Sequence, residues 1–186
     1  MIPIYFYIFF NDLWYTSSDI VVSFTNFRRN RLFMKKLLIV YHTQTDNTGR
    51  LARAVLKGAN NELVTEIETR FLMARDAGPD DLLWADGLLL GTPENFGYMS
   101  GGMKDFLDRT FYAVEGKILS LPYAVFISAG NDGTGALRAI RRIGNGYPFK
   151  EVQEPLIAQG EITEAHLESC EELGLTLAAG LEAGIF

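Results

Sequence analysis

The stretch LLIVYHTQTDNTGRLARAV, Leu37 to Val55, changes character twice. It opens as a continuous apolar run, continues with mostly hydroxyl and amide side chains from Thr43 to Thr48, and ends with apolar residues at helical spacing. A continuous apolar run is typical of a parallel strand that is covered on both faces. The stretch therefore predicts a buried strand, a polar loop and a helix, in that order.

Short apolar runs and helical patterns alternate from here to the C-terminus. Residues 86–92 and 122–129 predict two more buried strands, and residues 63–72 and 155–160 predict outer strands. Because crossovers between parallel strands are right-handed and connections stay short, five such strands predict an α/β fold with a three-layer, doubly wound parallel sheet. Ligands of these sheets bind beyond the carboxyl ends of the central strands. We therefore expect the function in the three loops that follow the buried strands.

The composition narrows the classes of function. The chain has 186 residues, enough for one domain, and its formal net charge of −6 argues against a nucleic-acid partner, which would require a basic face. Its single cysteine, Cys170, cannot form an internal disulfide, which favours a reducing cytoplasm, and we expect an inert core thiol. His42 and His166 are the only histidines, so no metal site is predicted. We expect a structural or capping role for His42, with contact to the site as the alternative.

Residues 1–33 do not follow the pattern of the rest. The run IPIYFYIFF, Ile2 to Phe10, is much shorter than the roughly 20 residues of a membrane span, and no signal-peptide pattern surrounds it. Three interpretations are open: an interfacial anchor, an extra structural element, or non-native upstream sequence. We favour upstream sequence, because Met34 and two lysines stand directly before the first buried strand. The expected organisation is an upstream or disordered extension at 1–33 and one domain at 34–186.

The first loop offers groups that bind a phosphate. Thr43, Thr45 and Thr48 carry hydroxyls, and the backbone from Gln44 to Thr48 supplies N–H groups at a helix start, where the dipole favours an anion. Neither GxxxxGK[ST] nor GxGxxG follows the first strand, which excludes the triphosphatase and dinucleotide Rossmann loops. The alternative is a polar turn in which Thr48 caps the helix.

The second loop carries the most specific motif. GTPENFGYMSGGMKDFLDRT, Gly91 to Thr110, resembles flavodoxin-like proteins that bind flavin mononucleotide (FMN), especially the branch of NAD(P)H:quinone oxidoreductases and NADPH-dependent FMN reductases. The hydroxyl-rich first loop resembles the phosphate loop of the same family. This resemblance implies a flavodoxin-like fold with strand order 2-1-3-4-5 and FMN as the cofactor.

The resemblance also implies where FMN lies. The first loop would wrap its phosphate, the second would lie against the flavin ring, and the third, SAGNDGTG from Ser128 to Gly135, would contact the ring edge and the ribityl chain. The implied cofactor-binding residues are Thr43, Gln44, Thr45, Asp46, Asn47, Thr48, Thr92, Pro93, Glu94, Asn95, Phe96, Gly97, Ser128, Ala129, Gly130, Asn131 and Gly133. As alternatives, Phe96 and Tyr98 would only cover the sheet end, and the glycines of the third loop would serve a mobile surface loop.

Asp46 departs from the pattern of the family. Asp46 stands where the family pattern has Gly, so its carboxylate would approach a phosphate unless it turns toward solvent, and Arg50 either compensates or lies on the surface. Asp tolerates the left-handed conformation that a Gly would hold.

The helix after the second loop is expected to be capped by Ser100. We assign four residues of the motif chiefly to helix packing, namely Met103, Lys104, Phe106 and Leu107.

Two function classes use such a site. A reductase leaves one flavin face open, so that NAD(P)H delivers hydride and a quinone or similar small acceptor takes the electrons. A carrier shields the flavin between aromatic rings. Because the loop from Ser128 to Gly135 contains no aromatic residue, the sequence favours the reductase, with the flavodoxin-type electron carrier as the alternative. No catalytic side chain is expected, since the hydride chemistry belongs to the cofactor. The resemblance also implies a homo-oligomer, and a scaffold that has lost its flavin is a third hypothesis.

Overall fold

The computed structural model describes residues 7–10, 13–16 and 34–186, which fall into two units, Met1–Met34 and Lys35–Phe186. In the first unit, β1 (Tyr7–Phe10) pairs antiparallel with β2 (Leu13–Thr16). Most of the expected extension at 1–33 lies outside the described residues, and its interpretation as upstream sequence stays a prediction. None of the helices within the described ranges is long and apolar enough to cross a membrane.

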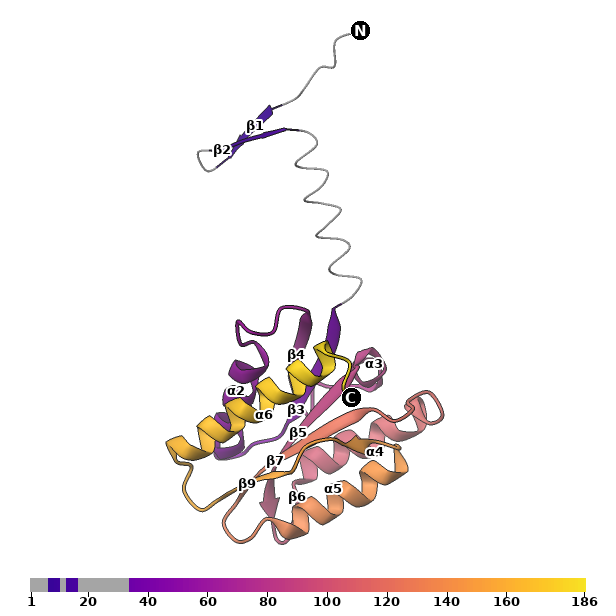
Figure 1. Cartoon of the computed structure of the whole chain (residues 1–186). Helices are drawn as coiled ribbons and strands as arrows, with labels where there is room; N and C mark the ends of the chain where they lie inside the picture. The colour runs from indigo at the N-terminus through magenta and orange to yellow at the C-terminus, as the bar shows by residue number, and fades with distance from the viewer. Residues whose placement is uncertain (1–6, 11–12, 17–33) are drawn as a thin grey trace. The chain divides into compact units, whose positions relative to one another are not determined.

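The second unit is built on a parallel sheet (Figure 1). Its strands are β3 (Lys35–Tyr41), β4 (Ile67–Met73), β5 (Gly87–Asn95), β7 (Pro122–Ala129), β8 (Lys150–Glu151) and β9 (Leu156–Gln159). They run in the order β4-β3-β5-β7, with both β8 and β9 pairing with β7. Counted from β3, this is the order 2-1-3-4-5, and the predicted flavodoxin-like α/β fold is confirmed. The fifth strand is split because Pro155, which has no N–H for the ladder, lies between its two parts.

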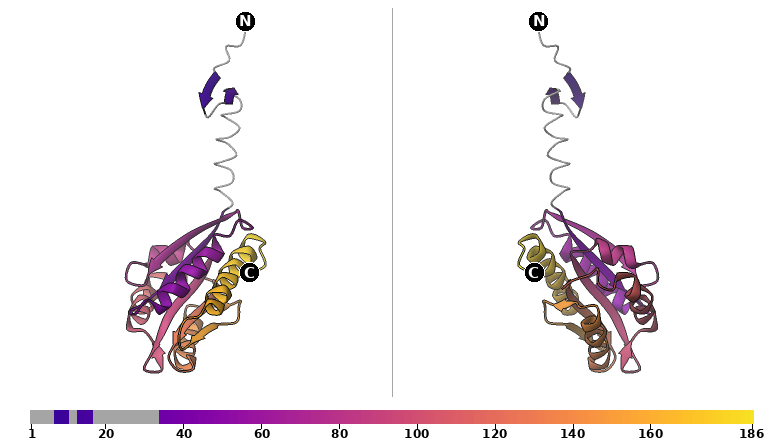
Figure 2. Two further views of the ribbon diagram at one scale, coloured as in Figure 1. Left: turned by 90° about the vertical axis from the view of Figure 1, so that its left-hand side faces the viewer. Right: turned by 90° about the vertical axis from the view of Figure 1, so that its right-hand side faces the viewer.

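Helices cover both faces of this sheet, as Figure 2 shows. The helices are α2 (Asn47–Ala59), α3 (Pro79–Trp84), α4 (Gly101–Val114), α5 (Thr134–Gly146) and α6 (Glu164–Glu182). Leu37 and Ile39 pack with α2 and α6, whereas Leu38 and Val40 pack with α3, α4 and α5. Successive side chains of a strand point to opposite faces, so a continuous apolar run supplies two cores. This explains why the opening stretch predicted a buried strand.

The largest departure from the sequence-based boundaries lies after the second buried strand. We expected that strand to end at Thr92, but β5 continues to Asn95 and turns back as β6 (Tyr98–Met99), so the second loop is a hairpin. The turn needs left-handed backbone at Phe96 (φ 53°) and Gly97 (φ 70°), as in the tight turns that match strand twist. A Gly is a recognisable turn signal there, whereas a Phe is not.

The helix after the hairpin follows the predicted pattern with one exception. Ser100 caps α4, because its hydroxyl accepts a hydrogen bond from the Met103 N–H at 3.3 Å. Met103, Phe106 and Leu107 are buried, so their assignment to packing is confirmed. The assignment of Lys104 is wrong, because its ammonium lies at the surface and donates to both carboxylate oxygens of Asp108 at 2.5 and 2.6 Å.

Candidate functional site

The carboxyl ends of β3, β5 and β7 bring the three predicted loops together at the edge of the sheet where the strand order reverses. A cavity of about 530 Å³ opens there. It is lined by Thr45, Asn47, Arg50, Pro93, Glu94, Asn95, Ser128, Ala129, Gly130, Gly160, Glu161 and Ile162. Each predicted loop contributes, so the sequence located this cavity correctly. The sequence analysis missed the loop after β9, residues 160–162, although it also follows the carboxyl end of a strand.

The first loop presents the start of α2 to this cavity. The helix begins at Asn47, and its first turn contains no acidic side chain. The first four N–H groups of a helix have no partner within the helix. Thr45 and Asn47 line the cavity together with Arg50, which forms no ion pair within the described part of the chain. This end of the cavity therefore offers hydroxyl and N–H donors beside a positive charge.

Thr48 plays a different part from that of its neighbours. It is 1% exposed, and its hydroxyl lies 2.7 Å from the hydroxyl of Ser128. The alternative in which Thr48 caps the helix is wrong, because Asp46 holds the cap position and Thr48 lies inside the first turn. The contact ties the first loop to the third and fixes their spacing.

Asp46 has the left-handed conformation that a Gly would adopt, with φ 66°. Its carboxylate accepts hydrogen bonds from both terminal nitrogens of Arg53, at 2.6 and 3.1 Å. Those bonds, followed by the charges of Arg53 and Arg50, hold the pKa of Asp46 below its usual range. A Cβ at position 49 would lie 2.2 Å from the Asp46 Oδ1, so Gly49 provides the room for this pairing. Asp46 is solvent-exposed and does not line the cavity.

The second loop lines the cavity through Pro93, Glu94 and Asn95. Thr92 lies behind them, fully buried, where its hydroxyl donates to Ser100 Oγ at 3.1 Å and accepts from the Ser100 N–H at 3.0 Å. Thr92 therefore anchors the hairpin to the α4 cap and does not line the cavity.

Phe96 lies at the tip of the same hairpin. Its side chain is fully exposed, at 109% of the reference area, although its backbone is left-handed. The alternative that Phe96 covers the sheet end is therefore wrong. A bulky residue in this conformation is a genuine outlier, and such outliers cluster at binding sites.

Glu94 joins the second loop to the third. Its carboxylate accepts hydrogen bonds from the N–H groups of Gly133, Gly135 and Ala136 at 3.0–3.2 Å. These three N–H groups lie at the start of α5, where they have no acceptor within the helix. The alternative of a freely mobile third loop does not agree with this tie. Asn131 is exposed and lies outside the cavity lining.

The histidines and the cysteine lie away from the cavity lining. The His42 ring packs against Gly102, and burial, followed by the Arg75 charge, lowers the pKa of His42, which keeps its imidazole neutral near pH 7. His166 stands at the start of α6, where its Nδ1 accepts from the Thr163 N–H at 3.3 Å. Cys170 is fully buried, and burial raises its pKa to about 12. Within the described ranges, no group of three His, Cys, Asp or Glu residues is arranged to hold a metal.

Comparisons with known proteins agree with this architecture. The family model of NADPH-dependent FMN reductases matches residues 76–155, which include the hairpin and the third loop. A flavodoxin of Aquifex aeolicus is 37% identical over 102 residues, covering 55% of this chain and 54% of the relative. An NAD(P)H dehydrogenase (quinone) of Acidithiobacillus ferrooxidans is 30% identical over 121 residues, covering 55% of this chain and 60% of the relative. The matches thus span little more than half the length of these curated relatives.

Solved structures are similar in fold. A flavodoxin from the domain Archaea superposes with a TM-score of 0.68 at 22% identity, over 79% of this chain and 99% of that structure. Together, the sheet order and these matches show a flavodoxin-like fold, and residues 76–155 of the chain are similar to the NADPH-dependent FMN reductases.

Proposed function

We propose that the chain binds FMN in the cavity of about 530 Å³ and passes electrons from NAD(P)H to a quinone or similar small acceptor. The observation that carries this proposal is the cavity itself, in which the loops after β3, β5, β7 and β9 bring hydroxyl, N–H and cationic groups together with apolar side chains. Its volume lies within the roughly 300–1,000 Å³ that is usual for small-molecule sites. The cavity is therefore large enough for a cofactor of this class.

The hydroxyl, N–H and cationic groups suit the FMN phosphate. Thr45 offers a hydroxyl, the start of α2 offers N–H groups, and Arg50 offers a charge at the same cavity. Hydrogen bonds to a charged group contribute about 1.5–3 kcal/mol each, more than the 0.3–1 kcal/mol of a helix dipole. Several such bonds would therefore dominate the affinity for the phosphate.

The apolar side chains suit the flavin ring. Pro93, Ala129 and Ile162 supply apolar walls, and Asn95 and the backbone of Gly130 supply polar groups for the ring edge. Phe96 stands exposed at the adjoining hairpin tip, where its ring is available to a flat ligand. When bound, FMN supplies the hydride chemistry, and the protein supplies position and electrostatics.

The distribution of aromatic residues favours a reductase over a carrier. The hairpin carries Phe96 and Tyr98, but the third loop from Ser128 to Gly135 carries no aromatic side chain. One face of a flavin in this cavity would stay open to a nicotinamide or an acceptor. The alternative is a flavodoxin-type one-electron carrier, which the similarity to the Aquifex aeolicus flavodoxin supports. A homo-oligomer and a cytoplasmic location, the latter fitting the single buried thiol, belong to the same proposal.

The cofactor part of the proposal is tested by titrating the purified chain with FMN. We expect a yellow complex with quenched flavin fluorescence, and we expect Thr45→Ala to weaken it at least tenfold. Thr176→Ala on α6, away from the cavity, is the matched control and should leave the affinity unchanged. A chain that FMN cannot reconstitute would refute the cofactor.

The reaction is tested separately with the loaded protein. Oxidation of NADPH or NADH in the presence of a benzoquinone would support the reductase. Failure with both nicotinamides, together with reduction by a ferredoxin-type reductase, would favour the carrier.

A further inference from the structure

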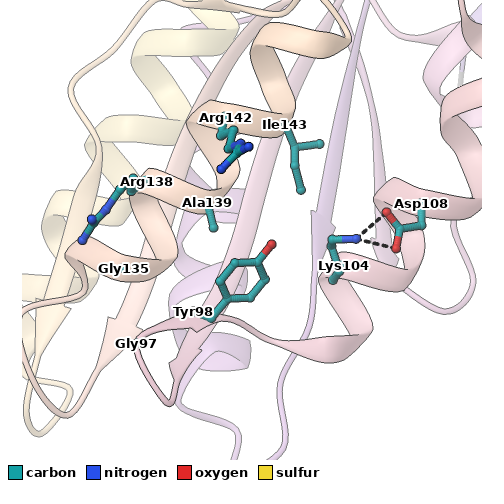
Figure 3. Close-up of a pocket in the computed structure, with 9 residues that line it drawn as sticks. All are labelled: Gly97, Tyr98, Lys104, Asp108, Gly135, Arg138, Ala139, Arg142 and Ile143. Carbon is teal, nitrogen blue, oxygen red and sulfur yellow. Dashed lines mark hydrogen bonds and ion pairs between the residues drawn. The ribbon is translucent and has the colours of Figure 1, made fainter.

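A second cavity, of about 630 Å³, lies on the other side of the hairpin, between α4 and α5 (Figure 3). We call it the α4–α5 groove, and it is lined by Gly97, Tyr98, Lys104, Asp108, Gly135, Arg138, Ala139, Arg142 and Ile143. It shares no lining residue with the first cavity. We propose that this groove binds the 2′-phosphoadenosine end of NADPH, which makes it a site for a phosphorylated nucleoside. This proposal rests on the reductase function proposed above.

The charge of the groove is opposite to that of the chain. The sequence as a whole carries −6, yet the α5 segment from Thr134 to Gly146 contains three arginines and no acidic residue. Arg141 is paired with Glu151 at 2.6 Å and does not line the groove. Arg138 and Arg142 line it, and neither forms an ion pair within the parts of the chain that the structure describes.

The spacing of these two arginines favours an anion. They stand four residues apart, so they are neighbours on one helix face, and like charges at this spacing repel each other. In Figure 3 the Arg142 guanidinium points into the groove and that of Arg138 points away from it, so an anion that engages both requires the Arg138 side chain to change rotamer, and binding then removes the repulsion. Guanidinium groups bind phosphate through two parallel N–H donors, which is a stronger and more specific contact than a lysine makes. The two side chains therefore suit a phosphate monoester.

The acidic groups near the groove are already engaged. Asp108 accepts both hydrogen bonds of Lys104, and this pairing raises the pKa of Lys104. Asp132 accepts hydrogen bonds from the N–H and the hydroxyl of Thr134, which lower its pKa, and the charge of Arg138 adds to that shift. Lys104 and Asp108 neutralise each other, so Arg138 and Arg142 are the lining cations without an ion pair among the described residues, and the Asp132 carboxylate offsets part of the Arg138 charge.

The remaining lining suits a nucleoside base. Tyr98 presents its ring in the groove below Arg142, as Figure 3 shows, and its side chain is 43% exposed. Ala139 and Ile143 supply apolar surface on the α5 side. An aromatic ring beside aliphatic side chains stacks on a flat base. Inorganic phosphate alone would leave this surface unused.

The hairpin connects the groove to the proposed flavin cavity. Glu94 and Asn95 line one cavity, whereas Gly97 and Tyr98 line the other. The hairpin also lies directly against α5, because a Cβ at Gly135 would stand 2.0 Å from the Gly97 carbonyl oxygen. A dinucleotide has two ends, so one molecule that crosses the hairpin can place its nicotinamide at the flavin and its phosphoadenosine in the groove.

The test measures binding directly, without turnover. Isothermal titration of the full chain with 2′,5′-ADP should show one site, and the double variant Arg138→Gln, Arg142→Gln should weaken it at least tenfold. Lys150→Gln, which removes an exposed positive charge on β8, is the control and should change nothing. Tyr98→Ala should lower the affinity for 2′,5′-ADP more than Tyr98→Phe does. In steady state the double variant should raise the KM for NADPH and leave that for NADH unchanged.

Several outcomes would overturn the proposal. They are no binding of 2′,5′-ADP by the wild-type chain, equal binding by the double variant, or inorganic phosphate binding as tightly as 2′,5′-ADP. Self-association that the double variant abolishes while 2′,5′-ADP binding survives would instead make the groove an interface between copies. Arginine-dependent binding of 2′,5′-ADP in a chain that oxidises neither nicotinamide would refute the reductase function and leave the groove as a nucleotide site.

Discussion

The Phe96 side chain contributes no buried surface to the fold. Phe96 holds left-handed backbone at φ 53°. We expect Phe96→Gly to stabilise the chain by about 0.5–1 kcal/mol, because Gly relieves the strained conformation. FMN affinity should fall several-fold, since an aromatic contact contributes about 0.5–1.5 kcal/mol. Urea unfolding and a flavin fluorescence titration measure the two effects, which have opposite signs.

The control for this prediction is a second exposed aromatic residue. Tyr112 on α4 is 83% exposed and lines neither cavity. Tyr112→Ala should leave FMN affinity unchanged. If Phe96→Gly also leaves it unchanged, Phe96 does not contact the flavin.

Asp46 gives the second prediction at this scale. Its carboxylate is paired with Arg53 and stands at the start of α2, so it adds a negative charge beside the proposed phosphate site. Two unit charges in water interact by about 1 kcal/mol at a separation of about 4 Å and by less at longer range. We therefore expect Asp46→Asn and Asp46→Gly each to tighten FMN binding about threefold at low salt, with the gain fading as salt screens the charge.

Asp46→Asn separates the charge from the backbone. Asn keeps the tolerance for left-handed backbone, so a gain shared by both variants is electrostatic. A gain seen only in Asp46→Gly would assign the effect to the backbone. Weaker binding in both variants would contradict the prediction.

At the scale of elements, α2 and α6 approach each other through glycines. A Cβ at Gly174 would lie 2.1 Å from the Val55 carbonyl oxygen, and one at Gly58 would lie 1.8 Å from the Glu171 carbonyl oxygen. We expect Gly174→Ala to destabilise the chain by about 1–3 kcal/mol, because the helices must separate. Gly146→Ala at the end of α5 meets nothing closer than 3.8 Å and should be neutral or stabilising. If both variants change the free energy of unfolding by the same amount, the close contact at Gly174 does not determine the stability of the chain.

The tie between α5 and β8 gives a pH-dependent prediction. Glu151 accepts hydrogen bonds from Arg141 at 2.6 and 2.8 Å, and these bonds, followed by the Arg141 charge, lower the pKa of Glu151 below its ordinary 4.5. Because the folded pKa is the lower one, the stabilisation is present above the unfolded pKa and is lost as pH falls through the folded pKa. We expect Glu151→Gln to cost roughly 0.5–1 kcal/mol at pH 7, in a partly exposed pair.

Urea unfolding of this variant at a series of pH values provides the measurement. The difference from the wild-type chain should shrink as pH falls below 4.5. The control is Glu115→Gln at the end of α4, an exposed position that forms no ion pair among the residues described. A difference that stays constant with pH would assign the cost to packing.

At the scale of the whole molecule, Cys170 reports the integrity of the core. It is the only cysteine of the chain, is fully buried, and has a pKa raised to about 12 by burial. Since the thiolate is the reactive form, we expect no reaction with a disulfide reagent at mildly alkaline pH until the chain unfolds. The labelling rate should therefore follow global unfolding in urea. Rapid labelling of the native chain would contradict the packing of α6 on the sheet.

The strand order was implied by the family resemblance, whereas the periodicity of the sequence predicted the parallel sheet, its covering helices and the position of the first cavity. These features depend on local spacing, because an apolar run marks a doubly covered strand and the loops after such strands must meet at one edge. The hairpin of β5 and β6 was not predicted, since only Gly97 of its turn is a recognisable turn residue. The boundary was therefore placed at Thr92, three residues before the strand ends at Asn95.

The sequence by itself determined the architecture of this protein and which loops carry its polar groups. Only the tertiary structure determined the hydrogen-bond partners of these polar side chains, because the partners lie far away in the sequence. Thr48 bonds to Ser128, Glu94 caps α5, and Asp46 turns to Arg53. The α4–α5 groove also exists only in three dimensions, since helix spacing places Arg138 and Arg142 together but the hairpin brings Tyr98 to them.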